Sequence, residues 1–146
     1  MNLETCEEYL ETIYKISNGS VRKLVKTGEI AKKMGLSPPT VTEVLPILEK
    51  QGYLTYKPYY GIILTEKGMK MGRKIVRTHR ILEVFLQEYF SMDLTTMHNK
   101  ACQLEHIFDS AMINEMCKKL GAPTKCPHGN DIPTCTNKYC PLETDC

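Results

Sequence analysis

Four residues with metal-binding side chains recur at helical spacing within nine positions of the chain. At i, i+4, i+7 and i+8 they are His98, Cys102, Glu105 and His106. This spacing predicts that one face of a single helix, which we expect to run from about Thr95 to Leu120, carries all four side chains. Imidazole, thiolate and carboxylate donors together are typical of sites for first-row divalent cations. The segment is therefore a candidate metal site.

Two further pairs of ligand-type residues lie in segments that are also predicted to be helical. His79 and Glu83 stand at i and i+4, and Glu8 and Glu11 stand at i and i+3. A single histidine on a helix is more often solvated or hydrogen-bonded than a metal ligand, but eight such residues together favour metal binding. One thiolate, from Cys102, among oxygen and nitrogen donors favours Fe(II), with Mn(II), Co(II), Ni(II) and Zn(II) as alternatives.

Cysteine is abundant, with seven residues in a chain of 146, and the odd count argues against a complete set of intramolecular disulfides. Four cysteines crowd into the C-terminal segment: Cys126, Cys135, Cys140 and Cys146. They could hold a structural zinc ion or an iron–sulfur cluster, with His128 as a further candidate ligand. Their spacing lacks a paired C-x-x-C motif, so a disordered or oxidised tail is an equal alternative.

Three short helices are predicted in the first third of the chain. The first spans about residues 4–16, and the second begins with Thr27 as N-cap and stops at Gly35. Ser37 is the expected N-cap of the third helix, which ends near Gly52. Two helices joined by a tight turn that contains glycine are typical of the helix-turn-helix, in which the second helix enters the major groove.

A β-hairpin and a long helix are predicted to follow. The β-favouring runs 53–56 and 62–65 flank a Pro- and Gly-containing turn, as in the wing of a winged helix. The long helix spans about 66–90, and it leads from the hairpin to the metal-ligating segment. Pro46 lies inside the third helix, where a proline removes a backbone hydrogen bond, so we expect a bend there.

The predicted fold class is mostly α: an N-terminal winged helix-turn-helix with a β-hairpin wing, followed by a helical metal-binding and dimerisation domain. We place the DNA-binding domain at 1–74, the helical domain at 75–133 and a Cys-rich tail at 134–146. Residues 1–80 carry 14 Lys and Arg against 8 Asp and Glu, whereas residues 81–146 carry 5 against 9. The basic half suits a polyanion such as DNA, and the acidic half suits cations.

The start of the third helix is the predicted DNA-reading surface. Its candidate residues are Ser37, Pro39, Thr40, Thr42 and Glu43, and the candidate phosphate contacts are Lys32, Lys33 and Lys57. Because the reading side chains are short and include no Arg, Asn or Gln, we expect modest direct readout, assisted by DNA shape and thymine methyl contacts. The alternative is that Ser37 only caps the helix and the lysines are only solvated.

Over about residues 5–133 the chain resembles the diphtheria toxin repressor family of iron- and manganese-dependent regulators. The motifs that carry the resemblance are Glu8-Tyr9-Leu10-Glu11-Thr12-Ile13-Tyr14, Ser37-Pro38-Pro39-Thr40-Val41-Thr42, His79-Arg80, Cys102-Gln103-Leu104-Glu105-His106 and Cys126-Pro127-His128-Gly129-Asn130. The resemblance implies a homodimer that binds palindromic operators when Fe(II) or Mn(II) is loaded and represses metal-uptake genes.

The resemblance also implies a division of the ligands between two sites. The DNA-activating site would take Glu8, Cys102, Glu105 and His106, and the ancillary site would take His79, Glu83 and His98. Glu8 departs from the family pattern, because iron-type members have Met and manganese-type members have Asp there. Cys102 stands where manganese-type members have Glu, so the site is a hybrid. We expect the two-domain form, without the SH3-like third domain of iron-type members.

The expected partners are double-stranded operator DNA and a second copy of the chain, with no membrane and no small organic substrate. No secretion signal begins the sequence and no long apolar run occurs in it, so a cytoplasmic location is expected. We do not expect an enzyme, although Cys102 and His106 could in principle act as nucleophile and base. A second alternative is a redox or zinc sensor that works through the tail cysteines.

Overall fold

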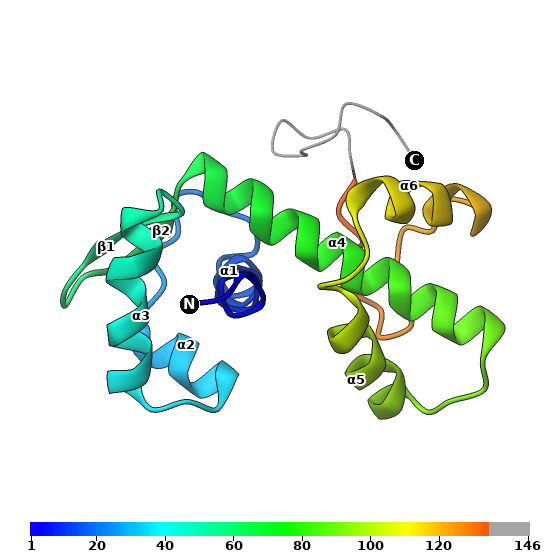
Figure 1. Ribbon diagram of the computed structural model, residues 1–146, viewed down its shortest axis with the longest axis horizontal. Coiled ribbons are helices and arrows are strands. Elements are labelled where there is room, and N and C mark those ends of the chain that lie inside the picture. Colours follow the sequence, from blue (N-terminus) through cyan, green and yellow to red (C-terminus); the bar gives the residue numbers. More distant parts are fainter. Residues whose placement is uncertain (135–146) are drawn as a thin grey trace. The chain divides into compact units, whose positions relative to one another are not determined.

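The computed structural model describes residues 1–134, which form six helices and one β-hairpin (Figure 1). The chain divides into two compact units, Met1–Arg73 and the part that begins at Lys74. Helix α4 (Glu66–Tyr89) contains the boundary. The predicted fold class, mostly α with an N-terminal winged helix-turn-helix, is confirmed. None of the helices in residues 1–134 combines the length and the apolar character that a membrane span needs.

Helix α1 (Leu3–Ser17) supplies much of the core of the first unit. Its first turn is capped by the Asn2 side chain, which accepts a hydrogen bond of 2.8 Å from the backbone N–H of Thr5. Leu10 and Ile13, at i and i+3, are completely buried. Capping therefore fixes where the helix begins, and the apolar stripe fixes which face is turned inward.

Helix α2 (Thr27–Met34) begins one residue earlier than the sequence predicted, with Lys26 rather than Thr27 as its N-cap. The cause is Glu29, whose carboxylate accepts a hydrogen bond of 2.8 Å from the backbone N–H of Lys26. The helix ends at Gly35, which has the left-handed φ of 67° that glycine adopts without strain. The tight turn of the helix-turn-helix follows from this glycine.

Helix α3 (Pro38–Lys50) is the second helix of the helix-turn-helix. The Ser37 hydroxyl accepts a hydrogen bond of 3.4 Å from the backbone N–H of Thr40, and Pro38 occupies the first turn, where its missing N–H costs nothing. The helix continues through Pro46 as a single element, and the bend at this residue stays a prediction. Its buried face consists of Val41, Leu45 and Leu48.

The wing is an antiparallel pair of strands, β1 (Leu54–Lys57) and β2 (Gly61–Leu64). A third segment joins it, because Val25 forms an antiparallel bridge with Ile62 through two backbone hydrogen bonds of 2.8 Å. Val25 and Ile62 are both completely buried. The hairpin is therefore held along its second strand by the segment that leads into α2.

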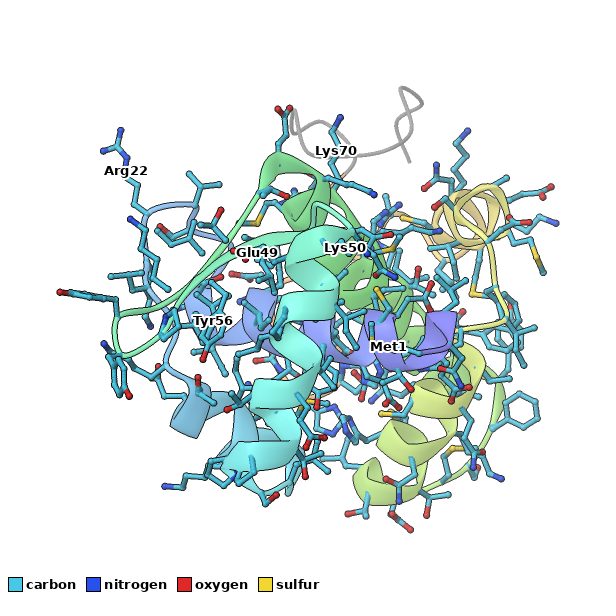
Figure 2. The ribbon with its side chains drawn as sticks, turned by 60° about the vertical axis from the view of Figure 1, so that its left-hand side comes forward. Met1, Arg22, Glu49, Lys50, Tyr56 and Lys70 are labelled. Atoms are coloured by element: carbon cyan, nitrogen blue, oxygen red, sulfur yellow. The ribbon has the colours of Figure 1, made fainter. Side chains whose placement is uncertain are left out.

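A hydrogen bond also ties the first strand to α3. The Glu49 carboxylate accepts from the backbone N–H of Tyr56 at 2.5 Å. In Figure 2 Glu49 and Lys50 lie on the last turns of α3, and Tyr56 lies on the hairpin beside it. The wing thus has a fixed position relative to α3 of the same unit.

Gly68, in the first turn of α4, allows that helix to approach the backbone that precedes β1. A Cβ at this position would lie 1.9 Å from the carbonyl oxygen of Tyr53. We expect Gly68→Ala to lower the free energy of unfolding by about 3 kcal/mol, because a backbone oxygen cannot move aside cheaply. Gly28→Ala is the matched control, since nothing lies within 4 Å of its added Cβ. Equal unfolding temperatures for the two variants would show that α4 does not pack this closely.

In the second unit the predicted single helix from Thr95 to Leu120 is wrong, because two helices occupy this stretch. They are α5 (Leu94–Leu104) and α6 (Ser110–Lys119). Asp109 is the N-cap of α6, and its side chain accepts a hydrogen bond of 2.8 Å from the backbone N–H of Met112. An aspartate cap therefore starts a new helix where neither glycine nor proline signals a break.

The segment 125–133, here called the strap, folds back onto α4 in a tight loop closed by a bridge between Lys125 and Asp131. Two arginines of α4 hold it: Arg77 donates to the Pro133 carbonyl at 3.4 Å, and Arg80 donates to the Asp131 carbonyl. The strap also contributes to the apolar core of this unit. The buried residues of that core are Ile81, Leu82, Leu86, Met97, Ala101, Ile113, Cys117, Cys126 and Ile132.

Candidate metal centre

Helices α4 and α5 each contribute two ligand-type side chains to one cluster in the second unit. His79 and Glu83 lie one turn apart on α4 and are both almost completely buried, whereas His98 and Cys102 lie one turn apart on α5. The Cys102 sulfur is 3.5 Å from His98 Nε2 and 3.9 Å from His79 Nδ1. His79 Nε2 is 3.2 Å from His98 Nδ1. We call His79, His98 and Cys102 the first ligand group.

Glu105 and His106 join this centre from outside the helix, which corrects the prediction of one continuous helical face. Helix α5 ends at Leu104, and Glu105 is its C-cap residue. The Glu105 carboxylate is buried and lies 2.6 Å from His79 Nδ1. His106 Nε2 lies 3.5 Å from the other oxygen of the same carboxylate. The end of the helix therefore places Glu105 where it fixes the orientation of the His79 ring.

The strap adds a second ligand group around Glu83. This group consists of Glu83, Cys126 and His128, whose ligand atoms lie within 4.8 Å of one another. His128 Nδ1 is 2.7 Å from Glu83 Oε2, and Cys126 is buried. The sequence predicts Cys126 as a ligand together with the tail cysteines, and His128 as a further candidate beside them. The missed signal is the Cys-x-His spacing followed by Gly129, which puts two donors on one short turn.

Charge and burial act in opposite directions on the two buried side chains of α4. Burial by itself lowers the pKa of His79, but hydrogen bonds with Cys102, Glu105 and Glu83 outweigh it and raise this pKa to about 11. Burial raises the pKa of Glu83, but its hydrogen bond with His79 and the nearby imidazoles bring this pKa below its ordinary value. Without a metal ion, a proton on His79 supplies a positive charge between the buried carboxylates. A metal ion that binds His79 must displace this proton.

One buried oxygen of the centre lacks a hydrogen bond among the described residues. Although His128 Nδ1 is close to it, Glu83 Oε2 makes no hydrogen bond of acceptable geometry within the described residues. A buried carboxylate oxygen without a hydrogen bond is costly, and such atoms in native proteins usually have a specific reason. Coordination of a divalent cation by imidazole, thiolate and carboxylate would satisfy it, so the residues present fit a metal ion.

The remaining predicted ligands belong to other segments of the chain. Glu8 and Glu11 are on α1, in the first unit, where Glu8 is exposed and Glu11 is buried with Lys15 Nζ 2.6 Å from its carboxylate. Their role as ligands stays a prediction. The predicted tail ligands Cys135, Cys140 and Cys146 fall outside the residues that the structure describes.

The predicted DNA-reading residues all lie on the exposed side of α3 and of the turn before it. Three of their hydroxyls have local partners: Ser37 Oγ is 2.7 Å from Thr40 Oγ1, and Thr42 Oγ1 donates to the Pro38 carbonyl at 2.9 Å. These bonds orient the side chains and leave acceptor lone pairs free for DNA. Glu43 and the lysines Lys32, Lys33 and Lys57 are also exposed.

A winged-helix unit joined to a helical unit with a buried cluster of metal-ligating side chains defines a class of metal-responsive DNA-binding protein. Comparison with known families agrees. Residues 1–62 match the family described as "Iron dependent repressor, N-terminal DNA binding domain", and residues 65–134 match "Iron dependent repressor, metal binding and dimerisation domain". The chain belongs to the iron-dependent repressor family, as the resemblance to the diphtheria toxin repressor predicted.

Individual relatives are similar over most of this chain. It is 36% identical over 113 residues to an uncharacterised HTH-type transcriptional regulator, MJ0568, of Methanocaldococcus jannaschii, covering 77% of this chain and 90% of that one. It is 32% identical over 131 residues to the iron-dependent repressor IdeR of Mycobacterium tuberculosis, covering 90% of this chain and 56% of that one. The chain thus spans about half the length of IdeR.

Among solved structures, that of the manganese regulator SloR is similar, with a TM-score of 0.75 and 32% identity over 88% of this chain and 59% of that one. The matched families consist of DNA-binding repressors, so the prediction that the protein is not an enzyme is confirmed. The Cys102 sulfur lies close to His79 and His98, two residues of the candidate metal centre.

Proposed function

We propose that the protein is a metal-activated transcriptional repressor whose operator binding depends on a divalent cation held by the second unit. The observation that carries this proposal is the buried centre built by α4, α5 and the strap. Imidazole, thiol and carboxylate groups converge there around Glu83, a buried carboxylate that lacks full hydrogen bonding. Relatives named as an iron-dependent repressor and as a manganese regulator support the same function.

We propose Fe(II) as the activating metal, with Mn(II), Co(II), Ni(II) and Zn(II) as alternatives. A thiolate in each ligand group, from Cys102 and Cys126, makes the donor set softer than the oxygen-rich sets that select Mn(II). A bound cation supplies the positive charge that the buried carboxylates otherwise take from a proton. The proposed ligands are His79, Glu83, His98, Cys102, Glu105, Cys126 and His128, with Glu8, Glu11 and His106 retained on sequence grounds.

The active species in this proposal is a homodimer on a palindromic operator of metal-uptake genes. The match of residues 65–134 to a metal-binding and dimerisation domain supports the dimer. A cation shifts the protein towards the conformation that binds DNA only if it binds this conformation more tightly than the conformation that does not bind DNA. The proposal is tested by metal analysis of protein purified without oxygen, together with operator binding titrated separately with each metal. Activation by none of them would reject it.

Cys102 is expected to select the metal. We predict that Cys102→Glu shifts the ratio of Fe(II) to Mn(II) activation towards manganese by about tenfold, because a carboxylate replaces the soft thiolate. By linkage, weaker Fe(II) binding also raises the Fe(II) concentration needed for operator binding. The measurement is anaerobic operator binding across matched titrations with the two metals. Gln103→Glu is the control, since it adds the same carboxylate at an exposed position of the same helix. An unchanged ratio in Cys102→Glu would end the assignment of Cys102 as the selecting ligand.

The tail cysteines are expected to be dispensable for the centre. Cys126 lies with Glu83 and His128, so a four-thiol site in the tail is not needed to explain the second ligand group. We predict that replacing Cys135, Cys140 and Cys146 together by Ser leaves metal content and operator binding unchanged, whereas Cys126→Ser alone weakens metal binding. Atomic absorption and metal titration of both variants measure this. Loss of metal from the triple variant would favour the alternative of a zinc or redox sensor that works through the tail.

A further inference from the structure

The tip of the wing carries two aromatic side chains that the folded unit does not use. Tyr59 is 100% exposed and Tyr60 is 69% exposed. Tyr59 also has a left-handed backbone, with φ of 70°, which is strained for a residue with a side chain. A fully exposed ring buries no apolar surface and does not offset that strain. Strain at an exposed aromatic residue points to a role in binding rather than in folding.

The wing tip is nevertheless held firmly in place. Lys26, just ahead of α2, donates a hydrogen bond from its Nζ to the Tyr60 carbonyl. Gly61 follows with φ of 142°, and a Cβ there would lie 2.9 Å from the Val25 carbonyl oxygen. The two tyrosines are therefore presented from a fixed backbone, which reduces the entropy that a contact through them would cost.

A cleft of about 670 Å³ lies beside the tip, between the wing, the start of α2 and α3. Thr42 and Pro46 line it from α3, and Tyr56, Lys57 and Tyr59 line it from the wing. None of the residues that line this cleft is acidic, and Lys26 and Lys57 both contribute to it. A basic cleft that is continuous with the DNA-reading face of α3 fits the sugar–phosphate backbone of duplex DNA.

We propose that Tyr59 and Tyr60 contact the sugar–phosphate backbone of operator DNA next to the groove that α3 enters. This inference rests on the proposed DNA-binding function and adds a contact of a different kind from the lysines. A phenol ring packs against deoxyribose and its hydroxyl donates to a phosphate oxygen, without releasing a counterion. The tyrosines therefore add affinity that does not depend on salt concentration.

The test uses metal-loaded full-length protein and a duplex that wild type selects from a random-sequence pool. Tyr59→Asn combined with Tyr60→Ser removes both rings, and asparagine tolerates the left-handed backbone. We expect this variant to bind about tenfold more weakly, with the slope of log affinity against log salt unchanged. Lys57→Ala, in contrast, should reduce that slope by about 1. Val21→Ser, at an exposed apolar residue that does not line the cleft, is the control and should bind like wild type.

The outcomes separate this proposal from the one on which it rests. Equal affinity of the wild type and the double variant would overturn the tyrosine contact and leave the proposed function intact. A weaker variant whose salt slope also falls would overturn it too, because the rings would then be acting only by positioning charges. Failure of metal-loaded wild type to select any duplex would remove the proposed function, and the wing contact with it.

Discussion

Glu105→Gln is expected to weaken binding of the activating metal by about 100-fold, because this carboxylate both contributes to the centre and orients His79. Its oxygen lies 2.6 Å from His79 Nδ1, and the side chain is buried just beyond the end of α5. Glutamine keeps the size and one acceptor oxygen but removes the negative charge. The buried site then has less charge to balance a divalent cation.

Anaerobic metal titration measures the affinity directly, and thermal unfolding gives an independent reading. At a metal concentration 100 times the dissociation constant, wild type should gain about 2.7 kcal/mol of stability, and the variant should gain much less. Glu88→Gln is the matched control, because it makes the same chemical change at an exposed position of α4. Wild-type metal affinity in Glu105→Gln would contradict the assignment of Glu105 to the centre.

The part of the site that lies on regular helices could be predicted from the sequence alone. His79 with Glu83, and His98 with Cys102, are spaced by four residues, and the helical repeat puts each pair on one face whatever the tertiary structure. The i, i+4 pattern depends only on the local helix and not on the tertiary fold. The meeting of the two pairs follows from the packing of α5 against α4.

The rest of the site depends on contacts between distant segments, which spacing cannot reveal. Glu105 reaches His79 because α5 ends at Leu104, and the Asp109 cap that starts the next helix was not recognised in the sequence. Cys126 and His128 reach Glu83 only because the strap folds back onto α4. The arginine contacts and the loop bridge that hold the strap link residues far apart in the chain.

The DNA-binding unit was easier to predict because strong local signals mark most of its elements. Ser37 and Pro38 begin α3, Gly35 ends α2, and a Pro- and Gly-containing turn separates the two strands of the wing. The start of α2 lies one residue earlier than predicted, because the Glu29 carboxylate accepts from the backbone N–H of Lys26 and makes Lys26, not Thr27, the N-cap. Local capping competition of this kind is decided by side-chain geometry, which the sequence does not specify.

Removal of the metal tests the central claim most directly. Operator affinity of the full-length protein should be measured under anaerobic conditions with Fe(II), with a strong chelator, and after Fe(II) is restored in excess. The duplex is one that the Fe(II)-loaded protein selects from a random-sequence pool. We predict that chelation lowers the affinity by about 100-fold, within the usual range of coupling between two sites, and that excess Fe(II) restores it. Equal affinity in the loaded and chelated states would contradict the account, because the centre on α4, α5 and the strap would then not control DNA binding.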